Sequence, residues 1–93
     1  MTRITISPNV LFQDLGGEAV LLNLDNDRYY GLDDVGTRMW QLLVQHGDVG
    51  MVVERLLGEY AGGVDEATLR RDLDELIGRL AEIGLVTVGP DRE

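Results

Sequence analysis

Few side chains in this sequence are suited to chemistry, and carboxylates are the main group among them. They cluster at residues 25–27, 33–34 and 72–75. The first cluster lacks the ligand spacing of a calcium-binding loop. The second precedes a helical pattern and suits a helix cap, and the third suits a solvated helix face. None of the three clusters therefore predicts a metal site or a catalytic site.

Histidine and cysteine chemistry is restricted further. His46 is the one histidine and the chain has no cysteine, which excludes a multi-histidine metal site, a thiolate ligand and a cysteine nucleophile within one chain. No serine lies in a nucleophile elbow, and no glycine-rich phosphate loop is present. His46 precedes Gly47 where a helix would end, and the helix dipole favours a cation there. We therefore expect no enzyme, no metal and no cofactor.

Length and charge narrow the class of protein. The 93 residues predict one domain over residues 1–88, followed by a flexible tail at 89–93. The net charge is −9 and there is no lysine, which disfavours a nucleic-acid partner because phosphate backbones are bound through Lys and Arg. An acidic surface suits a basic peptide or protein, or serves solubility alone. The chain has no cysteine, no signal-peptide features and no bilayer-length apolar run, so we expect a cytoplasmic protein with no membrane partner.

Three strands are predicted in the first third of the chain. Residues 10–15, 19–24 and 28–32 are candidate strands separated by a Gly-Gly turn signal and an Asp-Asn-Asp connection. Residues 19–24 are apolar at nearly every position, which is typical of a central strand that is covered on both faces. The first and third strands would then be the edges of the sheet. Residues 4–6 predict a short extended arm, which Pro8 ends.

Three helices are predicted to follow. Apolar residues recur at helical spacing over 34–45, 48–60 and 65–83, and an aspartate near the start of each can cap the helix. Glycine closes each helix, for the second one within residues 61–63. Residues 85–88 predict a short final strand.

Together these elements predict an α+β fold, in which a three-stranded antiparallel sheet is followed by three helices in a winged helix-turn-helix-like arrangement. In a DNA-binding protein of that kind the third helix carries basic side chains to the groove. Here residues 65–83 carry three arginines against six carboxylates, which is the wrong sign. Trp40, in the first helix, is expected in the core.

The third predicted helix has a wide apolar face. Its members recur at helical spacing: Leu69, Leu73, Leu76, Ile77, Leu80, Ala81 and Ile83. A face broader than one neighbour can cover is compatible with a groove along the flank of the helix. It is equally compatible with core packing on both sides.

Two segments resemble a known family. Residues 29–40 read Tyr-Tyr-Gly-Leu-Asp-Asp-Val-Gly-Thr-Arg-Met-Trp after Val-Leu-Leu-Asn-Leu-Asp at 20–25, and residues 76–86 read Leu-Ile-Gly-Arg-Leu-Ala-Glu-Ile-Gly-Leu-Val. These segments resemble the PqqD family, whose members are recognition elements for ribosomally made, modified peptides (RiPPs). The resemblance covers most of the chain. The tyrosine pair in a domain of this size is most similar to the discrete leader-binding proteins of lasso peptide biosynthesis.

The resemblance implies a peptide-binding site. In that family the leader of a precursor peptide adds as a strand to the third strand, in the cleft beside the third helix, which suits sequence-tolerant recognition. The residues implied are Arg28, Tyr29, Tyr30, Gly31 and Leu32 on the strand, and Leu69, Asp72, Leu73, Glu75 and Leu76 on the helix. Asp72 or Glu75 would meet a basic leader residue. Either tyrosine could face the groove, because neighbouring residues of a strand point to opposite sides.

The resemblance also implies partners and leaves alternatives. A leader peptidase and an ATP-dependent macrolactam cyclase would receive the bound precursor peptide. One alternative is a peptide chaperone for a radical enzyme in redox-cofactor biosynthesis, which differs only in its client. Another is an acidic winged-helix regulator that acts through protein contacts.

Overall fold

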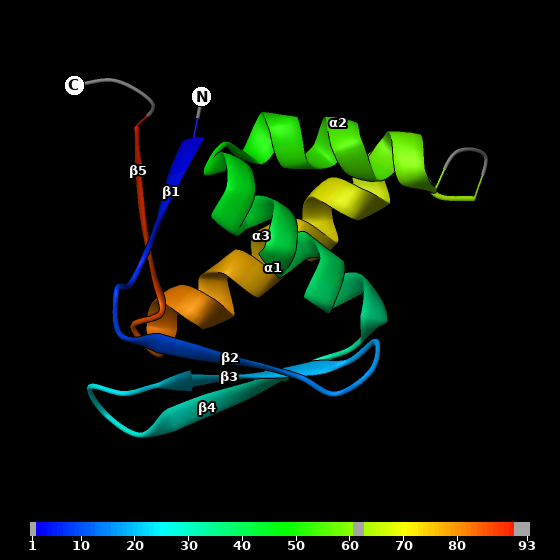
Figure 1. Ribbon diagram of the computed structural model, residues 1–93. Coiled ribbons are helices and arrows are strands. Elements are labelled where there is room, and N and C mark those ends of the chain that lie inside the picture. Colours follow the sequence, from blue (N-terminus) through cyan, green and yellow to red (C-terminus); the bar gives the residue numbers. More distant parts are fainter. Residues whose placement is uncertain (1, 61–62, 91–93) are drawn as a thin grey trace.

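The structure is a computed structural model that describes residues 2–60 and 63–90. Figure 1 shows three helices packed on one side of a three-stranded sheet, with two further strands side by side at one end of it. The elements in chain order are β1 (Thr2–Ile6), β2 (Val10–Asp14), β3 (Ala19–Asn23), β4 (Arg28–Leu32), α1 (Asp34–His46), α2 (Val49–Glu59), α3 (Glu66–Glu82) and β5 (Val86–Pro90). The predicted α+β fold is therefore confirmed.

The larger sheet is antiparallel with the order β2-β3-β4, so β3 is central and β2 and β4 are edges, as predicted. Ala19, Leu21 and Asn23 are buried on the face that the helices cover. Val20 and Leu22 point to the other face and are only half-buried. None of the described helices covers that outer face (Figure 1). The expectation that both faces of β3 are covered is therefore wrong, because the described helices all pack on one face of the sheet.

Each helix begins at an aspartate cap. Asp33, and not Asp34, caps α1, since its Oδ1 atom accepts the backbone N–H of Gly36 at 2.7 Å. Asp48 and Asp65 cap α2 and α3 in the same way. A cap of this kind stabilises a helix by about 1 kcal/mol.

Glycine ends α1 and α3 as predicted. Gly47 and Gly84 adopt left-handed backbone conformations, with φ of 68° and 81°. Residues 61 and 62, where the second helix was expected to close, lie outside the described residues.

The ends of the chain form a second sheet that the sequence did not predict. β1 and β5 pair antiparallel, with Ile4 opposite Val88. The sequence predicted an extended arm and a final strand without their pairing, because such a long-range contact leaves no local signal. β5 continues to Pro90, so residues 89 and 90 belong to this strand and not to the expected tail. Residues 91–93 of that tail lie outside the described residues.

One core joins the sheet to the helices. Trp40 is 3% exposed and lies in this core, as expected. Burying a large apolar side chain stabilises the fold by about 1.5–3 kcal/mol. The most completely buried apolar residues are Leu21, Leu42, Leu43, Leu56, Leu73, Leu80, Leu85, Val52 and Val53.

An ion pair joins α1 to α2. Arg38 donates to Glu59 twice, from Nε to Oε1 at 2.9 Å and from Nη2 to Oε2 at 2.6 Å. The hydrogen bond from Arg38 holds the pKa of Glu59 below its ordinary value, although burial acts in the opposite direction. The two side chains are 39% and 35% exposed, so solvent weakens the interaction.

We predict that Glu59→Gln lowers the free energy of unfolding by at most about 1 kcal/mol at neutral pH. Because the folded-state pKa of Glu59 is lowered, its contribution is present above the unfolded-state pKa and is lost as the pH falls through the folded-state value. Urea unfolding of both proteins should therefore differ at neutral pH and agree in acid. A difference that persists in acid would contradict this assignment.

Candidate functional site

The free edge of β4 exposes backbone groups that can bind another strand. The hydrogen bonds from Leu15 N–H to Glu18 O and from Leu24 N–H to Asn9 O flank the pairing of β2 with β3. They show which residues of β3 bond to β2 through their main chains, and therefore which residues of β3 are left to bond to β4. In an antiparallel ladder these groups alternate between the two sides of a strand. With the register observed, Arg28, Tyr30 and Leu32 bond to β3, which leaves the N–H and C=O groups of Tyr29 and Gly31 facing outward. Of the predicted edge residues 28–32, two therefore offer free main-chain groups to an added strand.

The two tyrosines face opposite sides of the sheet. Tyr30 lies opposite Leu21 on the helix-covered face and packs against the core. Tyr29 lies opposite Leu22 on the outer face and is 73% exposed. Tyr30 is therefore the tyrosine that faces the groove beside α3.

A groove of about 350 Å³ runs between the end of β4, the start of α1 and the flank of α3. It brings together four of the residues that the sequence predicted, Tyr30, Asp72, Glu75 and Leu76. The other lining residues were not predicted as site residues: Asp33, Val35, Gly36, Met39 and Arg79. Val35 and Met39 are one turn apart directly after the edge strand, a signal that could have found them.

Two predicted helix residues do not line the groove. Leu69 and Leu73 are 3% and 0% exposed, and both belong to the core between the helices. The wide apolar face of α3 is therefore largely core, and only its margin at Leu76 reaches the groove. Assigning Leu69 and Leu73 to a peptide-contacting surface is wrong, because a fully covered side chain offers no area to a ligand.

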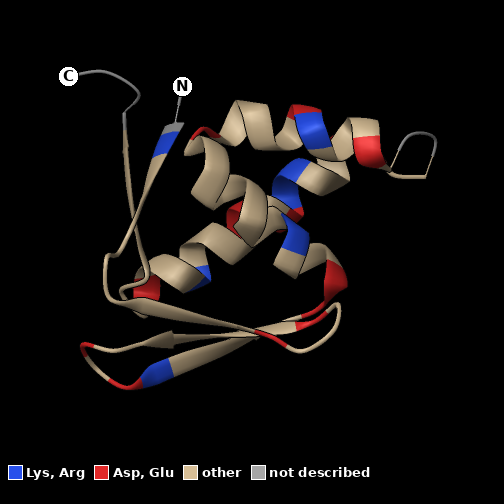
Figure 2. Ribbon diagram, viewed as in Figure 1, with Lys and Arg blue, Asp and Glu red and all other residues tan. Residues whose placement is uncertain are grey.

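The groove is polar along α3 and apolar beneath. Asp33, Asp72 and Glu75 supply three carboxylates against the single guanidinium of Arg79. The carboxylates of Asp72 and Glu75 have no hydrogen-bond or ion-pair partner in the part of the chain that the structure describes. Figure 2 shows further acidic residues at both ends of the three-stranded sheet. This arrangement can hold an extended chain that carries one apolar and one basic side chain on the same face.

The local sequence explains how α1 closes the end of the groove. A Cβ atom on Gly36 would lie 3.1 Å from Asp33 Oδ1 and 3.3 Å from Leu32 Cδ2. Glycine therefore allows the first turn of α1 to approach the end of β4 closely.

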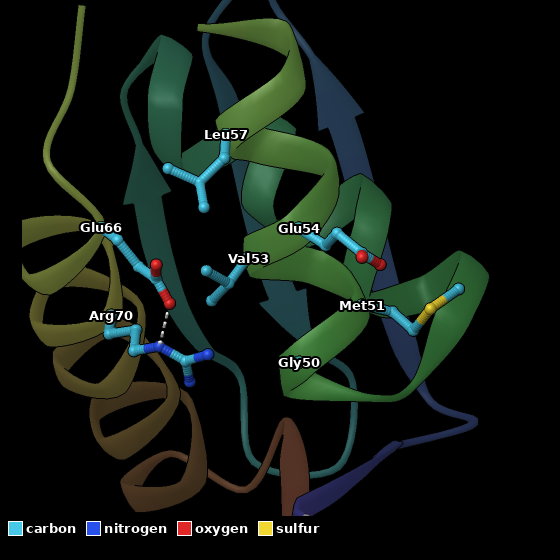
Figure 3. Close-up of a pocket in the computed structure, with 7 residues that line it drawn as sticks. All are labelled: Gly50, Met51, Val53, Glu54, Leu57, Glu66 and Arg70. Carbon is cyan, nitrogen blue, oxygen red and sulfur yellow. Dashed lines mark hydrogen bonds and ion pairs between the residues drawn. The ribbon is translucent and has the colours of Figure 1, made fainter. Parts of the chain in front are cut away.

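A second hollow, of about 430 Å³, lies between α2 and α3, away from β4. Figure 3 shows Met51, Val53 and Leu57 on one side of it, and Glu66 paired with Arg70 on the other at 3.1 Å. All the residues that line this hollow belong to α2 and α3, and none belongs to β4. Across residues 2–60 and 63–90, no group of three His, Cys, Asp or Glu residues could hold a metal ion, and no helix has the length and apolarity to cross a bilayer.

Comparison with known proteins assigns the family. The model for coenzyme PQQ synthesis protein D (PqqD) matches residues 18–86. The chain belongs to the PqqD family. Residues 18–86 include β3, β4 and all three helices, so the match covers the whole groove. No curated protein matches the chain.

Two solved structures are similar to this PqqD-family chain. The first, TbiB1 in complex with the TbiA(beta) leader peptide, is 36% identical with a TM-score of 0.79, and the match covers 88% of this chain and 93% of that chain. The second, a lasso peptide synthetase B1 complexed with the leader peptide, is 24% identical with a TM-score of 0.76, and the match covers 91% and 98%. At that lower identity the second likeness supports the fold alone.

We predict that Tyr30→Ala lowers the free energy of unfolding by about 1–3 kcal/mol, since it removes a half-buried ring from the edge of the core. Tyr29→Ala should cost less than about 1 kcal/mol, because only cross-strand contacts are lost. Urea unfolding followed by the fluorescence of Trp40 measures both changes. Equal losses, or a larger loss for Tyr29→Ala, would contradict the orientations described.

Proposed function

We propose that this PqqD-family protein binds the leader of a ribosomally made precursor peptide by adding the leader as a strand to β4. The observation that carries this proposal is the free edge at Tyr29 and Gly31 beside a groove of about 350 Å³. TbiB1, 36% identical to this chain, is described in complex with a leader peptide, which supports the same role here.

In strand addition, affinity and specificity come from different groups of the protein. Main-chain hydrogen bonds to Tyr29 and Gly31 would supply affinity that tolerates sequence change. The leader residue opposite Tyr30 would point into the groove, and so would the residues two positions away on either side. Tyr30 and Leu76 offer apolar contact to one of them. Asp72 and Glu75 suit a basic one, in keeping with the net charge of −9.

The proposed role is presentation, with no catalysis by this chain. By family resemblance the receiving enzymes are a leader peptidase and an ATP-dependent macrolactam cyclase. The outer face of the sheet offers a contact surface for the peptidase, because Leu11, Leu22 and Tyr29 lie in one cross-strand row. Leu11 and Tyr29 are 49% and 73% exposed. An exposed apolar row on a small domain is typical of a protein interface.

The two alternatives are not favoured by the comparisons. A regulator would bind DNA or another regulator, whereas TbiB1, which is 36% identical to this chain, is described in complex with a leader peptide. A helper of a radical enzyme would differ in its client alone.

The strand-addition proposal predicts that Gly31→Pro weakens leader binding by about tenfold or more. Proline removes the outward N–H of Gly31 and leaves the hydrogen bonds between β3 and β4 intact, since edge positions tolerate proline. Gly31→Ala is the matched control, because its Cβ would meet nothing within 4 Å and its N–H remains. Calorimetric titration with the leader half of the precursor encoded beside this gene measures each affinity. Equal affinities for both variants would refute strand addition at β4.

The presentation proposal predicts that Leu11→Ser slows leader removal by the peptidase severalfold, with leader affinity unchanged. Leu11 lies in the outer row on β2, at the opposite edge from the groove. Leu24→Ser is the control, since Leu24 is similarly exposed, at 55%, but lies outside the row. Cleavage of the precursor by the purified peptidase, with each variant added, distinguishes them. Equal cleavage with both variants would exclude the outer row as the peptidase contact.

A further inference from the structure

Two asparagines hold the β3–β4 hairpin against the end of α3. Asn23 Nδ2 donates to the backbone carbonyl of Ile83 at 2.7 Å, and Asn26 Nδ2 donates to the same oxygen at 3.3 Å. Ile83 is the C-cap residue of α3, where helix carbonyls lack helical partners. Both side chains thus satisfy one carbonyl at the negative end of the helix dipole.

Each asparagine also fixes part of the turn in the β3–β4 hairpin, to which both belong. The Oδ1 atom of Asn23 accepts the N–H of Asp25 at 2.9 Å, and that of Asn26 accepts the N–H of Arg28 at 3.0 Å. The acceptor of each carboxamide therefore fixes the turn that leads into β4, while the donor holds α3. The two roles reside in different atoms of the same side chain and can be separated by substitution.

The position of these bonds matters for the groove. Across residues 2–60 and 63–90, they are the only hydrogen bonds between the three-stranded sheet, with its β3–β4 connection, and α3 or its C-cap. Ile83 lies one helical turn beyond Arg79, which lines the groove, and Asn26 lies two residues before the start of β4. The contact therefore ties the two walls of the groove together at one end. It is also tightly fitted, since a Cβ atom on Gly84 would lie 3.0 Å from Asn23 Nδ2.

We infer that Asn23 and Asn26 are positioning residues that set the width of the leader-binding groove through the carbonyl of Ile83. This inference rests on the proposed function. Without the two donors, α3 and β4 remain parts of one fold through the core, but the distance between them is no longer fixed at the hairpin end. An added strand must contact β4 and α3 at once, so a groove of variable width binds it more weakly.

Asn26→Asp tests this inference. Aspartate keeps the acceptor for Arg28 N–H and replaces the donor to Ile83 by a carboxylate oxygen, whose negative charge is also unfavourable beside the carbonyl end of α3. Asn26 is exposed, so the variant folds without burying a charge. Loss of one hydrogen bond predicts a leader affinity lower by roughly two- to tenfold. Asn23→Asp should lower the affinity further, but Asn23 is 2% exposed, so this variant is interpreted only where circular dichroism shows the native fold.

Asn9→Ala is the matched control. Asn9 Nδ2 donates to Asp25 Oδ1 at 2.9 Å, so it fixes the same connection from the side of β2 through a bond that does not involve α3. Calorimetry with the leader half of the neighbouring precursor gives the affinities. The second readout is the distance between spin labels on Tyr29→Cys and Glu82→Cys, measured without peptide. Only the two introduced cysteines are labelled, because the chain has no cysteine of its own. Asn26→Asp should broaden or lengthen this distance, and Asn9→Ala should not.

The possible outcomes distinguish failure of this inference from failure of the proposed function. Lower affinity together with a changed distance in Asn26→Asp, and neither change in Asn9→Ala, supports the inference. If the unmodified protein binds the leader and Asn26→Asp shows the same affinity and distance, the inference is overturned and the proposed function stands. If the unmodified protein does not bind the leader, the proposed function fails and the inference fails with it.

Discussion

The register between β3 and β4 is the constraint on which the site depends. It places Tyr30 opposite Leu21 and Tyr29 opposite Leu22, and a slip of one residue would exchange the faces of the two tyrosines. Two features hold it. Leu21 is fully buried, and the connection of residues 24–27 closes with Asp27 at a φ of 61°, where its N–H donates to Asn23 O at 2.8 Å. The free backbone groups of the edge follow from this register together with the hydrogen bonds that pair β3 with β2.

The chain passes from the edge strand into the first helix within one residue, and this shortness shapes the groove. Asp33 follows Leu32 directly, caps α1 and lines the groove. Its cap bond to Gly36 holds the first turn of α1 beside the strand, which sets Val35 and Met39 beneath the edge. One aspartate thus couples the start of a helix to the shape of a binding surface.

Local signals made much of this structure predictable. Turn residues, aspartate caps and glycine ends predicted three strands and three helices, because each acts over a few residues. The pairing of β1 with β5 was missed, since it joins the two ends of the chain. Leu69 and Leu73 were misassigned to the groove because periodicity gives the apolar face of a helix but not what covers each part of it. The orientation of the tyrosines needed the register, which sequence did not fix.

Strand alternation lets one short edge meet two demands without conflict. Tyr30 belongs to the groove and to the core margin, so its size is constrained by both. Tyr29 is 73% exposed on the outer face, and its main chain, not its ring, belongs to the free edge. Side chains of the outer row can therefore change without altering those of the groove, because the two sets point to opposite faces of the sheet. Under the proposed function, a single small domain would in this way contact a peptide and a protein with adjacent residues.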